Sequence, residues 1–214
     1  MNYYVRTTGD RVLDSSYSQI PYTLITDKEY KPIDSFINAL YQINNEDSIL
    51  LEDDLILCKN FKEEIEKVIE QYPNRIINFF WFPQFYTQTK ESKGIVFNQC
   101  TYYPKGIAKQ IADIMINVPR RTDYKKNMYS LIEFQALKQL GIKVLQYRPC
   151  LVQHLDTDTL LFDKTFGQRR TPYFLDYLNQ LGITYEEARE PLNQRKLTQI
   201  MREDFTNREK LQSN

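Results

Sequence analysis

Residues 48–60 read SILLEDDLILCKN, and in this stretch two short apolar runs flank three consecutive carboxylates. A short continuous apolar run bounded by polar residues is typical of a buried strand at the centre of a sheet. The carboxylates are Glu52, Asp53 and Asp54, which we call the acidic cluster. They repel one another and are costly to bury without a positive partner. A divalent cation with oxygen ligands is the natural partner, and the simpler alternative is a solvated acidic turn between two strands.

Strand and helix patterns alternate on both sides of this stretch. Besides the central run, apolar patterns predict strands at residues 2–6, 22–26, 76–82, 95–102, 142–146 and 150–153. Apolar residues at helical spacing predict helices at residues 36–41, 61–69, 107–115 and 131–140. This alternation favours an α/β fold with a mainly parallel sheet.

The C-terminal part of the chain differs from the rest. Beyond His154 the sequence becomes more charged, and amphipathic helices are expected at residues 173–181, 185–189 and 192–205. We therefore expect an α/β domain over residues 1–172 and a helical C-terminal extension over residues 173–214.

Composition excludes several classes of protein. The 214 residues carry 28 Lys and Arg against 28 Asp and Glu, so the net charge gives no reason to expect a nucleic-acid or membrane partner. No apolar stretch is long enough to span a bilayer and the N-terminus has no signal-peptide core, so we expect a cytoplasmic location. The three cysteines are widely spaced and form no CxxC pair, which argues against a zinc ribbon or a disulfide framework.

Several residues with metal-ligand or acid–base chemistry follow predicted strands. Asp27, the acidic cluster and His154 each stand at the end of one, and α/β sheets bind ligands at the carboxyl ends of their strands. His154 is the single histidine of the chain and lies in RPCLVQHLDTDTLL at residues 148–161, just before Asp156 and Asp158. Mixed carboxylate and imidazole ligands suit manganese better than calcium.

Two of these stretches resemble motifs of a known family. ILLEDDLILCKNF at residues 49–61 resembles the acidic motif of GT-A-type glycosyltransferases, and the stretch at residues 148–161 resembles their C-terminal motif. The order and separation of the motifs also match, as does the predicted helix at residues 131–140. The resemblance covers about residues 1–172 and implies a GT-A-like, Rossmann-type nucleotide-binding mixed sheet flanked by helices. It also implies a nucleotide-sugar donor, with a UDP-sugar as the first expectation, and a Mn²⁺ or Mg²⁺ ion that neutralises charge on the leaving diphosphate.

The resemblance also assigns metal ligands. Carried over by position, Asp54 is the direct ligand of the metal and His154 is the late ligand. Glu52 and Asp53 would contact the metal, the ribose or the sugar. The family has glycine after the VQH stretch, whereas this chain has Asp156, so the surroundings of the metal differ from the family pattern.

Five further residues fit the donor pocket by the same resemblance. Arg6, Thr7 and Asp27 lie where such enzymes grip the nucleotide. Arg169 and Arg170 belong to a basic segment resembling the one that follows the VQH motif in related enzymes, where an arginine can clamp the diphosphate. The simpler alternatives are a surface ion pair for Arg6 and a solvated basic turn for the other two arginines.

The catalytic base is expected on or before the helix that precedes the VQH strand. In inverting members an Asp or Glu there removes the proton of the acceptor hydroxyl. Glu133, at the start of the predicted helix, is preferred over Asp123 in the preceding loop. The alternatives are an exposed helix residue for Glu133 and a turn residue for Asp123. The expected acidic pair is not preserved, so inverting and retaining chemistry both stay open.

The acceptor and two further functions stay open. A glycan or protein hydroxyl is the usual acceptor in the family. A basic loop at residues 120–126, together with residues 169–170, could contact phosphates, which makes a hydroxymethylated DNA base another candidate. A catalytically inactive nucleotide- or carbohydrate-binding module is one alternative function. A metal-dependent phosphoryl-transfer enzyme is a weaker one because no P-loop pattern is present.

Overall fold

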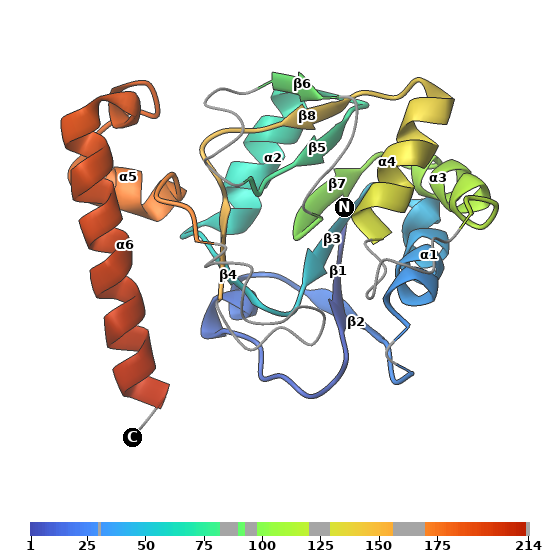
Figure 1. Cartoon of the computed structure of the whole chain (residues 1–214), viewed down its shortest axis with the longest axis horizontal. Helices are drawn as coiled ribbons and strands as arrows, with labels where there is room; N and C mark the ends of the chain where they lie inside the picture. Colours follow the sequence, from blue (N-terminus) through green and yellow to red (C-terminus); the bar gives the residue numbers. More distant parts are fainter. Residues whose placement is uncertain (30, 82–89, 93–97, 120–128, 156–169, 213–214) are drawn as a thin grey trace.

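The computed structural model describes residues 1–29, 31–81, 90–92, 98–119, 129–155 and 170–212 (Figure 1). Within these residues the main sheet has seven strands in the order β2-β1-β3-β7-β5-β8-β6. They are β1 (Asn2–Thr7), β2 (Tyr22–Thr26), β3 (Ser48–Glu52), β5 (Ile76–Asn78), β6 (Lys90–Ser92), β7 (Cys100–Tyr103) and β8 (Val144–Gln146). β4 (Leu55–Leu57) and β9 (Val152–His154) form a separate two-stranded sheet.

The main sheet is mixed. β1 pairs in parallel with both β2 and β3, and β5 pairs in parallel with β8. β7 lies between these two groups and runs antiparallel to β3 and β5, while β6 runs antiparallel to β8. The α/β class is therefore confirmed, and the sheet contains more antiparallel pairing than the alternation of strands and helices predicts.

Helices cover both faces of this sheet. They are α1 (Pro32–Gln42), α2 (Phe61–Gln71), α3 (Ile107–Met115), α4 (Tyr129–Leu140), α5 (Leu175–Leu181) and α6 (Pro191–Gln212). Short 3₁₀ helices lie at Ser15–Gln19, Ile43–Asn45 and Glu187–Arg189. Figure 1 shows α1, α3 and α4 grouped on one side of the molecule, whereas α5 and α6 lie at its opposite end.

Alternate side chains of each strand supply two apolar cores. In β3, Leu50 joins the core formed with α1, α3 and α4. Its neighbours Ile49 and Leu51 point to the other face and join the core that contains α2. Successive side chains of a strand point to opposite faces, so a continuous apolar run is what a strand covered on both faces requires. The prediction of a buried central strand is confirmed.

The C-terminal helices share the core of α2. Tyr177 of α5 and Leu197 and Phe205 of α6 are buried in that core. The backbone N–H of Lys59 donates to Asp176 Oδ1 at 3.0 Å, which attaches α5 to the start of α2. The segment is helical as predicted, although residues 187–189 form a single 3₁₀ turn. Within the described ranges, no helix is long and apolar enough to cross a bilayer.

Candidate metal and nucleotide site

The candidate site lies where β1, β2 and β3 end. These strands run parallel, so their carboxyl ends meet at one edge of the sheet. Thr7 and Glu52 are the last residues of β1 and β3, and Asp27 follows β2. The backbone N–H of Asp27 donates to the carbonyl oxygen of Thr7 at 2.8 Å, which fixes the two strand ends together. The structure therefore brings these predicted site residues to a common edge.

The main chain leaves this sheet within the acidic cluster. After Glu52 it turns through Asp53 and Asp54 and enters β4, which belongs to the small sheet. β4 pairs antiparallel with β9, and Leu55 lies opposite His154. The acidic turn therefore stands at the junction of two sheets.

Asp53 is held by two side chains from the N-terminal part of the chain. Its Oδ2 accepts a hydrogen bond of 2.6 Å from the Thr7 hydroxyl, and its Oδ1 lies 3.0 Å from Arg11 Nη1. The carboxylate is buried. The hydroxyl of Thr7 therefore holds the Asp53 carboxylate in place.

Asp54 and His154 lie side by side. His154 Nε2 is 3.3 Å from Asp54 Oδ2, and the backbone N–H of Leu155 donates to the carbonyl oxygen of Asp54 at 2.7 Å. His154 is buried, so its imidazole is fixed by the small sheet. Arg11 Nη1 is also 2.9 Å from Asp54 Oδ2. Asp54 and His154, which the resemblance assigns to the metal, are thus in contact with each other. The guanidinium of Arg11 contacts Asp54 as well.

Glu52 forms a buried ion pair with Arg6. Arg6 Nη2 lies 2.7 Å from Glu52 Oε1, and the hydroxyl of Tyr129 donates to the same oxygen at 2.8 Å. Burial raises the pKa of Glu52, and the charge of Arg6 opposes this increase. The guanidinium carbon of Arg6 lies 4.2 Å from the ring centroid of Tyr129 and 5.3 Å from that of Phe36. Arg6 is therefore an internal partner of Glu52, and the surface ion pair considered from the sequence is wrong.

Glu133 is fully buried in α4. The hydroxyl of Tyr103 donates to its Oε1 at 2.7 Å, and Asn98 Nδ2 donates to its Oε2. Burial raises the pKa of Glu133 to about 7, even though both hydrogen bonds favour the charged form. Tyr129 lies four residues earlier on the same helix and reaches Glu52, so Glu133 lies one turn below the site edge. The alternative of an exposed helix residue is wrong.

The side chains of Asp54 and His154 fit a divalent cation that takes its remaining ligands from outside the protein. Asp54 and His154 supply one carboxylate and one imidazole, a combination that suits manganese. Among the described residues, no group of three or more His, Cys, Asp or Glu is arranged to hold a metal. Magnesium-type sites are commonly completed by water and substrate phosphates, so two protein ligands are sufficient. Asp156 and Asp158 lie outside the described residues.

Three other predicted contributors are not among the residues that the structure brings together at the acidic cluster, two of them because they are not described. Asp123 and Arg169 fall outside the described residues. Arg170 stacks on the C-terminal helix, with its guanidinium carbon 3.6 Å from the ring centroid of Phe205. The basic loop at residues 120–126 also lies outside the described part of the chain.

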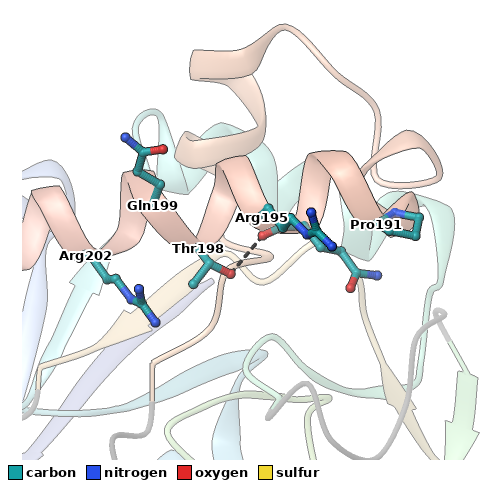
Figure 2. A pocket seen from close by; sticks show the side chains of 6 residues that line it. Pro191, Arg195, Thr198, Gln199 and Arg202 are labelled. Carbon is teal, nitrogen blue, oxygen red and sulfur yellow. Dashed lines mark hydrogen bonds between the residues drawn. The ribbon is translucent and has the colours of Figure 1, made fainter.

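A hollow runs along one face of α6 (Figure 2). It is lined by Pro191, Gln194, Arg195, Thr198, Gln199 and Arg202. The hydroxyl of Thr198 donates back to the carbonyl oxygen of Gln194 at 2.8 Å, so this side chain serves its own helix. These described lining residues include no carboxylate and no histidine, so they provide none of the side-chain types that make up the acidic cluster and its histidine partner.

Sequence patterns missed Arg11 and Tyr129. Arg11 stands in a polar turn after β1, and only its charge near a strand end hinted at a role. Tyr129 begins α4 beside a basic stretch, and no sequence pattern indicated that it lies at the site. Both are brought to the acidic cluster by tertiary contacts that no local pattern encodes.

Comparisons with known proteins leave the family unassigned. No protein-family model matches the sequence, and no curated protein sequence matches it. Among solved structures, the chain is similar to one titled "Crystal Structure of A197 from STIV", with 6% sequence identity and a TM-score of 0.42. The match covers 78% of this chain and 100% of that chain. This similarity is too low to carry a conclusion about function.

Proposed function

We propose that the protein is a metal-dependent glycosyltransferase with a GT-A-like fold, which moves a sugar from a nucleotide-sugar donor to an acceptor hydroxyl. The observation that carries this proposal is the 3.3 Å approach of His154 Nε2 to Asp54 Oδ2. These residues belong to the two stretches whose sequences resemble the acidic and C-terminal motifs of that family. Their meeting at the carboxyl ends of parallel strands, where α/β sheets bind ligands, supports a donor site there.

In this proposal Asp54 and His154 hold a Mn²⁺ or Mg²⁺ ion, with Glu52 close by. When bound, the ion would neutralise charge on the leaving nucleoside diphosphate. Thr7 keeps the Asp53 carboxylate in place, and Arg6 does the same for Glu52. We therefore propose that Arg6 and Thr7 position the acidic residues.

The nucleotide pocket would extend from the acidic cluster toward the end of β2. Asp27 lies at this edge, and its Oδ1 accepts bonds of 3.2 Å from the backbone N–H groups of Glu29 and Lys31. These bonds hold the Asp27 carboxylate against the turn that follows β2. We propose that this turn forms one wall of the pocket for the ribose, and that a UDP-sugar is the donor.

Glu133 is our candidate for the base that accepts the proton of the acceptor hydroxyl. A pKa of about 7 suits proton transfer at neutral pH. The carboxylate is enclosed by Tyr103 and Asn98, so proton transfer requires the start of α4 to open toward the acceptor. Asp123 is the alternative base. A glycan or protein hydroxyl is the proposed acceptor, and a hydroxymethylated DNA base is the alternative.

A catalytically inactive nucleotide- or carbohydrate-binding module is the second candidate function. Arg11 Nη1 lies within 3.0 Å of both Asp53 and Asp54, so a side chain already neutralises part of the acidic cluster. A cluster stabilised in this way can persist in the fold without metal-dependent chemistry. This observation favours the module over a metal-dependent phosphoryl-transfer enzyme, which would need the same carboxylates for its ions.

Isothermal titration calorimetry and a donor-hydrolysis assay together test the proposal. The full chain is titrated with UDP in the presence of Mn²⁺, Mg²⁺ or EDTA, and release of UDP from UDP-sugars is then followed. Metal-dependent UDP binding with slow donor hydrolysis supports the glycosyltransferase. Binding without hydrolysis or transfer supports the inactive module, and absence of binding with any metal rejects the donor site. Asp113→Asn is the control, because Asp113 is an exposed residue of α3 that pairs with Lys109.

A further inference from the structure

Arg11 places its guanidinium against two carboxylates of the acidic cluster. One atom, Nη1, is 3.0 Å from Asp53 Oδ1 and 2.9 Å from Asp54 Oδ2. Asp54 Oδ2 is also the oxygen that approaches His154 Nε2 at 3.3 Å. A single guanidinium nitrogen therefore bridges two carboxylates, and it contacts the very oxygen that faces the histidine.

The turn that carries Arg11 is attached to the same carboxylates. The backbone N–H of Gly9 donates to Thr7 Oγ1 at 2.9 Å, and that hydroxyl donates to Asp53 Oδ2. Gly9 has φ +88°, in the region that favours glycine, so the chain reverses here without a side-chain clash. The reversal returns Arg11 to the acidic cluster.

Arg11 remains accessible from solvent. Its side chain is 20% exposed, and the next residue, Val12, is 96% exposed. The charges of Asp54 and Asp53 raise the pKa of Arg11 against the effect of its partial burial, so the guanidinium stays positive. A charged side chain on a surface turn can change partners without disturbing the sheet beneath it.

We propose that Arg11 is a positioning residue that couples metal binding to diphosphate binding at this site, an inference that rests on the proposed function. Without ligand, Arg11 bridges Asp53 and Asp54 and competes with a divalent cation for Asp54. A cation at Asp54 repels the guanidinium and displaces it from the carboxylates. The diphosphate then supplies oxygens that Arg11 can bind through paired N–H groups. The metal alone therefore binds weakly, and the diphosphate strengthens its binding by giving Arg11 a new partner.

The first test measures Mn²⁺ binding alone by isothermal titration calorimetry. Wild type is compared with Arg11→Gln, which removes the charge, and with Arg75→Gln as the matched control. Arg75 pairs with Glu91 and precedes β5, at the edge opposite the acidic cluster. We expect Arg11→Gln to bind Mn²⁺ about tenfold more tightly than wild type, and the control to match wild type.

The second test repeats the titrations at saturating UDP. In the proposed site Mn²⁺ would contact the diphosphate of UDP, so UDP should tighten Mn²⁺ binding in every variant. If Arg11 contributes to the coupling between Mn²⁺ and diphosphate binding, UDP should tighten Mn²⁺ binding about fivefold less in Arg11→Gln than in wild type. Circular dichroism confirms that each variant is folded. Arg11→Lys serves if the glutamine variant does not fold, because lysine keeps the charge but has a shorter side chain, so its ammonium does not reach the position from which Arg11 Nη1 bridges the two carboxylates. We expect its Mn²⁺ affinity to lie above that of wild type.

The outcomes separate this inference from the function on which it rests. Equal Mn²⁺ affinities in wild type and the Arg11 variants overturn the inference, even if wild type binds Mn²⁺ with UDP and the proposed function stands. Equal tightening by UDP in wild type and Arg11→Gln also overturns it. If folded wild type and variants bind neither Mn²⁺ nor UDP, the proposed function and the inference both fail.

Discussion

The imidazole of His154 contacts the carboxylate of Asp54, with 3.3 Å between Nε2 and Oδ2. The contact depends on the antiparallel pairing of β9 with β4, which places His154 opposite Leu55. The bond from the Leu155 N–H to the Asp54 carbonyl oxygen fixes the backbones as well. His154 is therefore held by a sheet, and Asp54 lies in the turn directly before β4, where this backbone bond fastens it to the end of β9. A sheet is a more rigid support than a loop.

Replacing either member of this pair is expected to weaken metal-dependent binding. In Asp54→Asn and His154→Gln, the affinity for UDP in the presence of Mn²⁺ should fall by about 10- to 100-fold, because each variant removes one of two protein donors. Binding in EDTA should not change. Calorimetry measures both affinities, with Asp113→Asn as the exposed control. Wild-type affinity in both variants would place the metal elsewhere.

Arg6→Met should destabilise the fold strongly. It leaves Glu52 charged and buried without its ion-pair partner, a change that typically costs about 3–5 kcal/mol. Urea denaturation gives the free energy of unfolding. Lys67→Met, which removes an exposed pair with Glu64, is the control and should cost less than about 0.5 kcal/mol. If Arg6→Met and Lys67→Met lowered the free energy of unfolding by similarly small amounts, the buried ion pair of Arg6 with Glu52 would not be important for stability.

The loss of folding stability in Arg6→Met should also depend on pH. Burial already raises the folded-state pKa of Glu52 above its unfolded value, and removing Arg6 raises it further. A raised carboxyl pKa favours the protonated folded state, so stability is greater at low pH and falls as pH rises. The destabilisation by Arg6→Met should therefore be smaller at pH 5 than at pH 8. A loss independent of pH would indicate that packing against Tyr129 and Phe36 dominates.

Glu133→Gln should change how stability depends on pH. The pKa of Glu133 is about 7 in the folded state and is near 4.5 when unfolded, a difference equivalent to about 3 kcal/mol. The folded state holds the extra proton between these values, so wild-type stability falls as pH rises from about 4.5 to 7. The glutamine variant lacks this fall, and its stability relative to wild type should increase toward pH 8. Urea denaturation at several pH values provides the measurement.

The same variant tests the catalytic role of Glu133. If this residue is the base, Glu133→Gln should abolish the rise of sugar transfer with pH near 7 while UDP binding stays unchanged. Retained transfer with a wild-type pH profile would assign the base elsewhere, with Asp123 as the next candidate.

Tyr129→Phe should lower stability by about 1.5 kcal/mol. It removes a hydroxyl that donates to the buried carboxylate of Glu52, and such a bond to a charged group typically contributes about 1.5–3 kcal/mol. Tyr41→Phe is the matched control, because its hydroxyl donates to the exposed Asp113. Equal losses of stability in Tyr129→Phe and Tyr41→Phe would show that burying the hydrogen bond from Tyr129 to Glu52 adds little to its strength.

The apolar patterns predicted the main strands and helices, because a strand that is buried on both faces of the sheet needs a continuous run of apolar residues. The run at Ile49–Leu51 is such a case, since Leu50 packs on one face and its neighbours on the other. The same pattern could not show that β3 and β4 belong to different sheets. Sheet membership depends on which distant strand supplies the partner, and for β4 that partner is β9.

The candidate site was predicted in part for similar reasons. Charged residues at strand ends directed attention to Asp54 and His154, which the structure places in contact. Arg11 was missed because its role arises from a turn at Gly9 that folds back on the acidic cluster. The burial of Glu133 was missed as well, because its partners Asn98 and Tyr103 come from a separate strand region.

The pairing of β4 with β9 has a consequence for split-protein experiments. A cut between Leu140 and Gly141 would leave Asp54 on one piece and His154 on the other. The second piece would also carry β8, which pairs with β5 and β6 of the first. Co-expressed pieces would therefore have to complete both sheets before the two donors meet. Reconstitution of Mn²⁺ binding from such pieces would report directly on assembly of the whole fold.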